Sequence, residues 1–203
     1  SGPPPSSRAG VAAFTTSTGY GIAKYDNPEE LSVSDRNNIG YQYTDCPLYW
    51  ISVIYLNFAE AKAEMGSLTQ DDLNNSINKL QARAGLPAMT TTPDADPANN
   101  MGVSNLIWEI RRCRRCELIM DNWYRYWDLI RWHQLDKLDS TKYPNTMLGA
   151  NVSNVPDCEE ATKNGYIDAS DAQIRTYEAK HYFYPIPTTQ LTLNKNMKQN
   201  PGW

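Results

Sequence analysis

The feature that most constrains this sequence is the stretch 110–132, IRRCRRCELIMDNWYRYWDLIRW. Its first turns carry four arginines, which on a helix would point in at least three directions, so some of them must meet protein rather than water. Arginine forms two-point hydrogen bonds to carboxylates, which suits pairing between helices. We therefore predict two helices, or one bent helix with a weak break near Asp121-Asn122, held by ion pairs. The four arginines are Arg111, Arg112, Arg114 and Arg115.

Acidic residues stand at helical spacing from these and later arginines. Glu117 lies three residues after Arg114, and Asp128 lies three residues from both Arg125 and Arg131, which are neighbour positions on a helix. An arginine-rich helix face of this kind is more typical of a scaffold than of a reactive site. The apolar residues expected to pack against neighbours are Leu106, Ile110, Leu118, Trp127 and Ile130, and the tryptophans expected in the core are Trp123, Trp127 and Trp132.

Composition excludes several classes of protein. The 203 residues carry a net charge of −4 and a pI near 5.2, which argues against nucleic-acid binding because that requires a basic face. No apolar run reaches the length needed to span a membrane. The chain begins SGPPPSSRAG without a signal peptide, which we interpret as a cut end rather than a statement about location.

Two helices are predicted before the arginine-rich stretch. The first covers Pro47–Gly66, and the second covers Thr69–Ala84, with Thr69 as the capping residue and Asp72 as its partner. Gly66 and Gly85 are good helix stops. The apolar stripes are expected at Ile51, Ile54, Tyr55, Phe58 and Ala59 on the first helix, and at Leu73, Ile77, Leu80 and Ala84 on the second.

A helix pair of this size matches one tetratricopeptide unit of ~34 residues. A single unit cannot bury its own apolar face, since such repeats need about three copies for stability. No second copy occurs in this sequence. We therefore expect the pair, over residues 47–86, to pack on the arginine- and tryptophan-rich helices at 102–138 or on repeats outside this chain.

The remaining segments give weaker predictions. Residues 1–18 are expected to be extended or loose, and 139–203 to be irregular, especially the Asn- and Asp-rich part at 139–170. Helices are expected at Gly102–Leu118, with Ser104 as cap, at Asn122–Leu138 and, more briefly, at Ser170–Ala179. The other expected elements are strands at Gly19–Tyr25 and Tyr182–Ile186, loops at Asn27–Asp45 and Met89–Asn100, and one helical turn at Thr188–Leu193.

The four cysteines leave alternatives open. Cys113 and Cys116 have the spacing of a zinc or redox pair, but they lie inside a predicted helix with no strand before it, so buried free thiols are the simpler interpretation. We predict no metal site and no cofactor. A disulfide between Cys46 and Cys158 is possible if the protein resides in an oxidising compartment.

Three stretches together resemble the C-terminal part of SusD/RagB-type proteins, spanning roughly residues 47–203 in that family's order. The family is one of outer-membrane lipoproteins of Bacteroidetes. Departures include Cys113 and Cys116, Asp121-Asn122 in place of a common Glu-Gly, and Trp50 at a position often held by arginine. The matching residues are Tyr55–Ala61 with Ile77-Asn78 and Arg83–Pro87; Ile110-Arg111, Glu117-Leu118, Trp127–Leu129 and Arg131-Trp132; and Tyr184–Pro187, Leu193-Asn194 and Gln199–Trp203.

The resemblance implies a mainly α fold: a tetratricopeptide-like helical hairpin packed on further helices, with long irregular loops and at most a short edge hairpin. It implies a single C-terminal domain, residues 1–203, of a longer protein whose lipid anchor, the source of its membrane association, lies outside this chain. Members act at the cell surface on the outer membrane. They capture oligosaccharides or polysaccharides for a TonB-dependent transporter during polysaccharide utilisation.

A chain of this kind has three conceivable functions. The leading one is non-catalytic glycan capture, because sugar rings rest on aromatic faces while their hydroxyls bond to Asn, Asp, Gln and Arg. The candidate ligand-contacting residues are the loop tyrosines Tyr41, Tyr43, Tyr143 and Tyr166. The alternative is a structural scaffold or docking module that contacts the transporter and binds no glycan itself.

An enzyme, such as a glycosidase with paired carboxylates, is not expected. Glu117, Asp121 and Asp128 are present, but a carboxylate pair needs a cleft, and these residues have arginine neighbours that account for them. His133 and His181 lack a nucleophile in any recognisable motif, so no catalytic residue is predicted.

Overall fold

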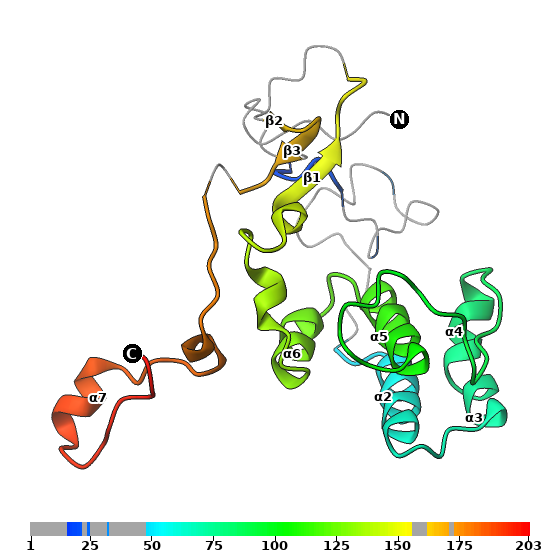
Figure 1. The fold of residues 1–203 in the computed structure, drawn as a ribbon, viewed down its shortest axis with the longest axis horizontal. Helices are drawn as coiled ribbons and strands as arrows, with labels where there is room; N and C mark the ends of the chain where they lie inside the picture. The colour runs from blue at the N-terminus through cyan, green and yellow to red at the C-terminus, as the bar shows by residue number, and fades with distance from the viewer. Residues whose placement is uncertain (1–15, 22–23, 25–31, 33–47, 156–161, 171–172) are drawn as a thin grey trace. The chain divides into compact units, whose positions relative to one another are not determined.

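The computed structural model describes residues 16–21, 24, 32, 48–155, 162–170 and 173–203 (Figure 1). The chain forms two compact units, one comprising Pro47–Gln134 and the other comprising Ser1–Cys46 with Leu135–Trp203. The first unit is helical, and the second contains a small sheet and short helices. The prediction of a mainly α fold is thus confirmed. The predicted loop Asn27–Asp45 and most of residues 1–18 lie outside the described residues.

A helical hairpin opens the first unit, as predicted. Helix α2 covers Ile51–Glu64, and the predicted second helix is divided into α3, Gln70–Asn74, and α4, Ile77–Arg83. Thr69 and Asp72 cap α3 reciprocally, with Asp72 N–H donating to Thr69 Oγ1 at 3.1 Å and Thr69 N–H donating to Asp72 Oδ2 at 2.9 Å. The division falls at Ser76, whose hydroxyl donates to the Asp72 carbonyl at 2.6 Å and so competes with the helical backbone ladder.

Glycine ends both arms of the hairpin. Gly66 and Gly85 have φ values of 65° and 68°, in the left-handed region that glycine adopts without strain. Beyond them, Ser67 N–H donates to the Lys62 carbonyl and Leu86 N–H donates to that of Gln81, each at 2.9 Å. These bonds complete Schellman motifs, so both predicted stops are confirmed.

The apolar stripe predicted for α2 is correct in part: Ala59 is buried and Tyr55 is half-buried against the core, but the other three residues are not buried. Ile51, Ile54 and Phe58 are exposed, with 63%, 60% and 43% of their surface accessible. Beside Ala59, the buried face carries Val53 and Leu56, together with Ser52 and Glu60. The buried Glu60 gives this face a polar sequence pattern. The opposite face is apolar in sequence, but no described residue covers it. On the second helix Leu73, Ile77 and Leu80 are buried as predicted, and Ala84 is exposed.

Helix α5, Asn105–Glu117, packs beside α2 (Figure 1). Its predicted cap is confirmed, since Ser104 Oγ accepts from Ile107 N–H at 3.3 Å. Ile110 and Leu118 join the core formed by the hairpin, and Leu106 is half-buried against it.

The predicted break after α5 is present. Met120, Asn122 and Trp123 all have positive φ, and helix α6 covers only Tyr124–Arg131. It ends earlier than predicted because His133 is left-handed, with φ of 53°, and Leu135–Leu138 forms a separate 3-10 helix.

The break also resets the helical phase, so the tryptophan prediction is only partly correct. Trp132 is buried, with 9% accessible, and Ile130 is half-buried. Trp123 and Trp127 are exposed, with 81% and 54% accessible. The buried residues of α6 are Asp128 and Leu129, so Trp127 lies beside the covered face rather than on it, with its ring edge-on to Tyr126.

The second unit contains a three-stranded antiparallel sheet within the region predicted to be irregular. Its strands are β1, Leu148–Asn151, β2, Thr162–Lys163, and β3, Tyr166–Asp168, in the order β1-β3-β2. Asn164 and Gly165, with φ of 54° and 80°, make the two-residue turn between β2 and β3. Asn-Gly is a strong hairpin signal, so this turn was readable in the sequence.

A small second core lies under this sheet, formed by Ala150, Val152 and Ile167. The backbone of Thr18 runs against β1, where its carbonyl accepts from Ala150 N–H at 2.8 Å. Gly149 allows this approach, because a Cβ there would lie 2.3 Å from the Thr18 carbonyl oxygen.

The last segments of the second unit differ from two predictions. Residues 173–178 are not helical, and 182–186 form no strand; 3-10 helices occupy Pro144–Met147 and Ala179–Tyr182. The Gln199 carboxamide accepts from the Ile186 N–H at 2.8 Å and donates to the Ile186 carbonyl at 2.9 Å. It thus satisfies the two backbone groups that a neighbouring strand would otherwise bond. Helix α7, Thr188–Leu193, confirms the predicted turn. Residues 19–21, the described start of the predicted first strand, are not strand.

Candidate functional site

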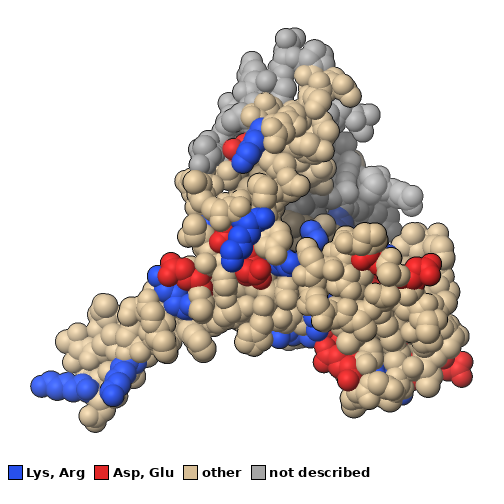
Figure 2. Space-filling view, in the orientation of Figure 1, with Lys and Arg blue, Asp and Glu red and all other residues tan. Residues whose placement is uncertain are grey.

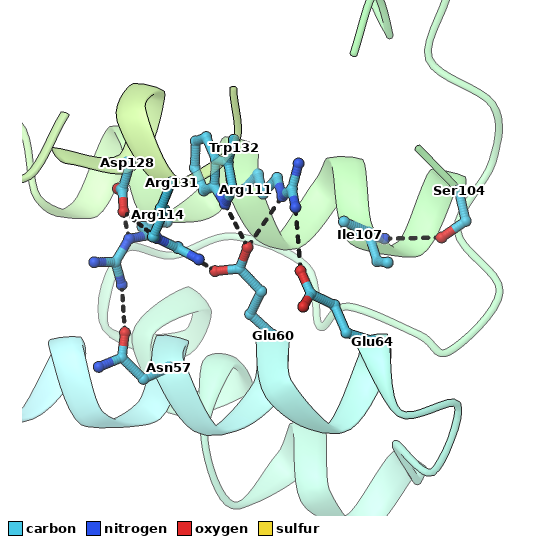
Figure 3. A network of polar contacts seen from close by, with 10 residues as sticks. All are labelled: Asn57, Glu60, Glu64, Ser104, Ile107, Arg111, Arg114, Asp128, Arg131 and Trp132. Carbon is cyan, nitrogen blue, oxygen red and sulfur yellow. Dashed lines mark hydrogen bonds and ion pairs between the residues drawn. The ribbon is translucent and has the colours of Figure 1, made fainter. Parts of the chain in front are cut away.

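The arginine cluster is organised around a buried carboxylate, Glu60 of α2 (Figure 3). Arg111 Nε and Trp132 Nε1 donate to Glu60 Oε1 at 3.0 and 2.7 Å, and Arg131 donates to the other oxygen. Arg111 also reaches Glu64 at 3.1 Å. Burial alone would raise the pKa of Glu60, but the hydrogen bonds from Arg131, Trp132 and Arg111 and the charge of Arg131 lower it below its usual range. The charged Glu60 side chain therefore links α2 to residues of α5 and α6 through ion pairs and a hydrogen bond.

A second set of ion pairs between the helices is centred on Asp128 of α6. Its two oxygens accept from Arg114 Nε at 2.6 Å and from Arg131 Nε at 2.9 Å, and Arg114 also donates to Asn57 of α2 at 2.9 Å (Figure 3). The predicted pair of Asp128 with Arg131 is confirmed, whereas its other predicted neighbour, Arg125, forms no ion pair with a described residue, and Arg114 is the second partner. Glu117, by contrast, pairs with Arg83 of the hairpin, at 2.6 and 2.7 Å.

The chemistry of this network is structural. The carboxylates of Glu60 and Asp128 are fixed by guanidinium groups and are almost fully buried, with 4% and 6% of their side chains accessible. A general acid or nucleophile needs an approachable oxygen, and these offer none.

The two described cysteines lie on α5 as free thiols, with Cys113 half-buried and Cys116 exposed. Burial raises the pKa of Cys113 to about 12. The description of both as buried thiols is therefore wrong for Cys116. Cys46 and Cys158 lie outside the described residues.

The described part of the second unit holds a polar pocket of about 210 Å³. Three chain segments form it: the turn before β1, the ends of β2 and β3, and the stretch at 173–174. Its wall mixes hydroxyl, amide and charged groups with aliphatic side chains. The lining residues are Ser140, Thr141, Pro144, Met147, Leu148, Lys163, Asp168, Ser170, Gln173 and Ile174.

Asp139 fixes one wall of this pocket. Its carboxylate accepts from the Thr141 hydroxyl and from the backbone N–H of Thr141, Lys142 and Tyr177. These hydrogen bonds, led by that of the Thr141 hydroxyl, lower the pKa of Asp139 to about 2. The carboxylate thus holds the 139–142 turn and residue 177 together.

A second clamp closes the same wall. The Ser140 backbone N–H donates to the Arg175 carbonyl at 2.9 Å, and Ser140 Oγ accepts from the Arg175 N–H at 3.0 Å. Residues 35 positions apart in the sequence are thereby joined at the rim of the pocket.

The two charged residues that line the pocket differ in the polar contacts that their side chains make. Asp168 Oδ1 accepts from both the backbone and the hydroxyl of Ser170, at 3.0 and 2.5 Å. Lys163, exposed on β2, has no ion pair or hydrogen bond from its ammonium group to any described residue. The charged group of this pocket that has no partner among the described residues is therefore the Lys163 ammonium group, a cation.

Two of the four predicted tyrosines, Tyr143 and Tyr166, belong to the described residues, and neither lines this pocket. Tyr143 lies next to Pro144, but its hydroxyl bonds Lys137 and Asp136, at 3.0 and 3.4 Å, and its ring lies under the Lys137 ammonium. Tyr166 is partly exposed on β3, two residues from Asp168 and therefore on the same strand face. Tyr41 and Tyr43 lie outside the described residues.

Sequence reasoning missed the pocket residues themselves. The pocket is lined by residues from separate segments, among them Ser140, Lys163 and Gln173. Long-range hydrogen bonds, and no sequence motif, bring these segments together. The Asn-Gly turn was the one usable signal, since it places Lys163 and Tyr166 opposite each other across a hairpin.

The sequence profile of the SusD family matches residues 1–203. The chain belongs to the SusD family. A crystal structure of a SusD-like protein from Bacteroides fragilis is similar, with a TM-score of 0.52 and 25% identity, over 75% of this chain and 25% of that one. This SusD-family chain thus spans about a quarter of the length of that protein. No curated protein sequence matches it.

The face drawn in Figure 2 is largely uncharged, with Lys and Arg side chains next to Asp and Glu in several small groups. Within the described residues, no helix combines the length and apolarity required to cross a bilayer.

Proposed function

We propose that this SusD-family chain is part of a non-catalytic protein that captures glycan nutrients at the bacterial outer membrane and passes them to a TonB-dependent transporter. The observation that carries the proposal is the family match over residues 1–203. The polar pocket supports it, because hydroxyl and amide groups beside aliphatic side chains suit a sugar ring with its alternating polar edge and apolar face.

Catalysis is not part of this proposal. Two buried acidic residues of the helical unit, Glu60 and Asp128, form ion pairs with arginines. In the pocket, Asp168 is held by Ser170. A glycosidase needs two carboxyl groups flanking one bond, and Asp168 is the sole carboxylate among the lining residues of the described pocket.

The test is calorimetric titration of the 203-residue chain with a panel of oligosaccharides, together with an assay for released reducing ends. We expect heat of binding with at least one glycan and no release of reducing sugar. Binding that disappears when Ser140 is replaced by alanine, but not when the remote Lys195 is replaced, would assign it to the pocket. Reducing-sugar release by the pure protein would refute the non-catalytic part.

A second candidate is a docking module that binds a protein partner and no glycan. It is favoured by the uncovered face of α2, where Ile51, Ile54 and Phe58 lie exposed at helical spacing. Replacing Ile51 and Ile54 by serine distinguishes the two candidates. Under glycan capture the variant retains oligosaccharide binding, whereas under docking it loses pull-down of the transporter while no oligosaccharide binds either form.

A further inference from the structure

We infer that the pocket of the second unit binds an acidic sugar, with the Lys163 ammonium group paired to the carboxylate of a uronic acid. The inference rests on the proposed glycan capture and narrows its ligand to an anionic class. The observation behind it is a sugar-sized polar pocket in which the Lys163 ammonium group has no described partner, while the one lining carboxylate, Asp168, is hydrogen-bonded to Ser170.

The first step concerns the negative charge. Asp168 keeps its negative charge, but its Oδ1 accepts from the Ser170 backbone and hydroxyl, at 3.0 and 2.5 Å, so that oxygen is bonded within the protein. Asp139, which fixes the wall, is buried and accepts four hydrogen bonds from Thr141, Lys142 and Tyr177. With four hydrogen bonds Asp139 has no acceptor site left for a ligand, whereas Asp168 is bonded to Ser170 through one of its two oxygens.

The second step concerns the positive charge. Lys163 stands on the two-residue strand β2, where its position is set by pairing with Tyr166 across the Asn-Gly turn. None of the described carboxylates is paired with its ammonium group. Lysine is a compact, strongly hydrated charge with three donors, which suits a single carboxylate on a flexible partner. A ligand that brings its own carboxylate supplies the counter-ion that the described residues do not.

The third step concerns shape. The volume of about 210 Å³ corresponds to roughly seven water molecules at ~30 Å³ each, which is the scale of one sugar ring rather than of an extended chain. Met147, Leu148 and Ile174 offer an aliphatic surface to the C–H face of a ring, and Ser140 and Gln173 offer polar groups to its hydroxyls. The pocket therefore fits a single acidic residue at the end or the branch of a glycan.

The test uses a matched pair of ligands: a uronic-acid tetrasaccharide and the same tetrasaccharide after reduction of its carboxyl groups to neutral alcohols. Each is titrated into the ¹⁵N-labelled 203-residue chain, and the amide signals of Lys163, Asp168 and Ser170 are followed by NMR. We expect these signals to move with the acidic sugar, and the affinity to fall between 20 mM and 500 mM salt because screening weakens an exposed ion pair.

Variants then locate the charge. Lys163→Met keeps the aliphatic stem and removes the ammonium group, Lys163→Arg keeps a cation, and Lys195→Met makes the same change in net charge at an exposed site that does not line the pocket. Because the ion pair is solvent-exposed, Lys163→Met should weaken acidic-sugar binding by about two- to fivefold, while the other two variants should change it by less than about 1.5-fold.

The outcomes separate this inference from the proposed function. If the neutral tetrasaccharide moves the same amides with equal affinity, or if Lys163→Met behaves like Lys195→Met, the acidic specificity is wrong and glycan capture stands. If neither tetrasaccharide, nor any member of the oligosaccharide panel, produces shifts or heat, both the inference and the proposed capture by this chain are refuted.

Discussion

Replacing Asp128 by asparagine tests whether the arginine network holds the helical unit together. The variant exchanges the carboxylate between Arg114 and Arg131 for a neutral carboxamide of the same size. The Arg114 side chain is only 5% accessible, so the exchange leaves the guanidinium charge of Arg114 buried without its carboxylate partner. Apart from residue 128, the hydrogen-bond acceptor of this guanidinium group is Asn57. Breaking one side of a buried ion pair costs ~3–5 kcal/mol. The asparagine oxygen can keep one hydrogen bond, so we expect about 3 kcal/mol.

Glu117→Gln is the matched control, since it makes the same kind of change in the same unit. Its partner Arg83 has 60% of its side chain exposed, so water replaces much of the lost interaction. Exposed ion pairs of this type contribute ~0–1 kcal/mol. The predicted difference between the two variants is therefore about 2 kcal/mol or more in the free energy of unfolding.

Urea unfolding followed by tryptophan fluorescence suits this comparison. Five of the six tryptophans, at positions 50, 108, 123, 127 and 132, belong to the helical unit, so the signal reports mainly on that unit. The unfolding midpoint should fall clearly for Asp128→Asn and little for Glu117→Gln, with similar slopes. A cost below about 1 kcal/mol for Asp128→Asn, or one no larger than that of the control, would show that the buried pair is not what holds α5 and α6 on the hairpin.

Three further predictions concern single features. Asp139, with its pKa lowered to about 2, lends stability that is complete above pH ~4, the pKa range of an unfolded aspartate, and is lost as the pH falls through 2, which an NMR titration of its carboxyl carbon would follow. Gly149→Ala should cost ~1–3 kcal/mol, measured by thermal unfolding, because its Cβ would collide with the backbone of Thr18. Cys116 should react with iodoacetamide at pH 8 at least tenfold faster than Cys113, by peptide mapping, because Cys113 is half-buried with a raised pKa.

Local rules predicted the ends of the helices well. Caps and glycine stops act through neighbours a few residues away, so Thr69 with Asp72, Ser104, and the glycines at 66 and 85 could be identified without any knowledge of the fold. The break after α5 was also predicted at the right place, near Asp121-Asn122, but Met120 and Trp123 share the positive φ with Asn122, which local residue preferences do not predict.

The choice of buried face could not be made locally. On α2, Glu60 is buried because Arg111, Arg131 and Trp132 arrive from residues more than 50 positions later to satisfy it. A single sequence scores glutamate as a surface residue, and so the predicted stripe was centred on the exposed Ile51, Ile54 and Phe58 rather than on the buried Val53 and Leu56. The same limit hid the pocket, whose wall depends on Ser140 meeting Arg175.

The two units differ in how their charges are used, and that difference makes stability and binding separable. In the helical unit, Glu60 and Asp128 are saturated by arginines, and a ligand competing for those arginines would first have to break buried pairs. In the other unit, Lys163 lines a pocket with no described partner for its charge. Asp128→Asn should therefore lower the unfolding midpoint and leave the affinity of the folded chain for a uronic-acid tetrasaccharide unchanged. Lys163→Met should do the reverse.

That pair of results has to be measured on the same preparations, by urea unfolding and by titration in the absence of urea at a temperature where circular dichroism shows both variants folded. If Asp128→Asn lost affinity while fully folded, the arginine network would be part of the binding surface. If Lys163→Met lowered the unfolding midpoint by as much as Asp128→Asn, its charge would be structural, and the pocket would have no cation to spare for a ligand.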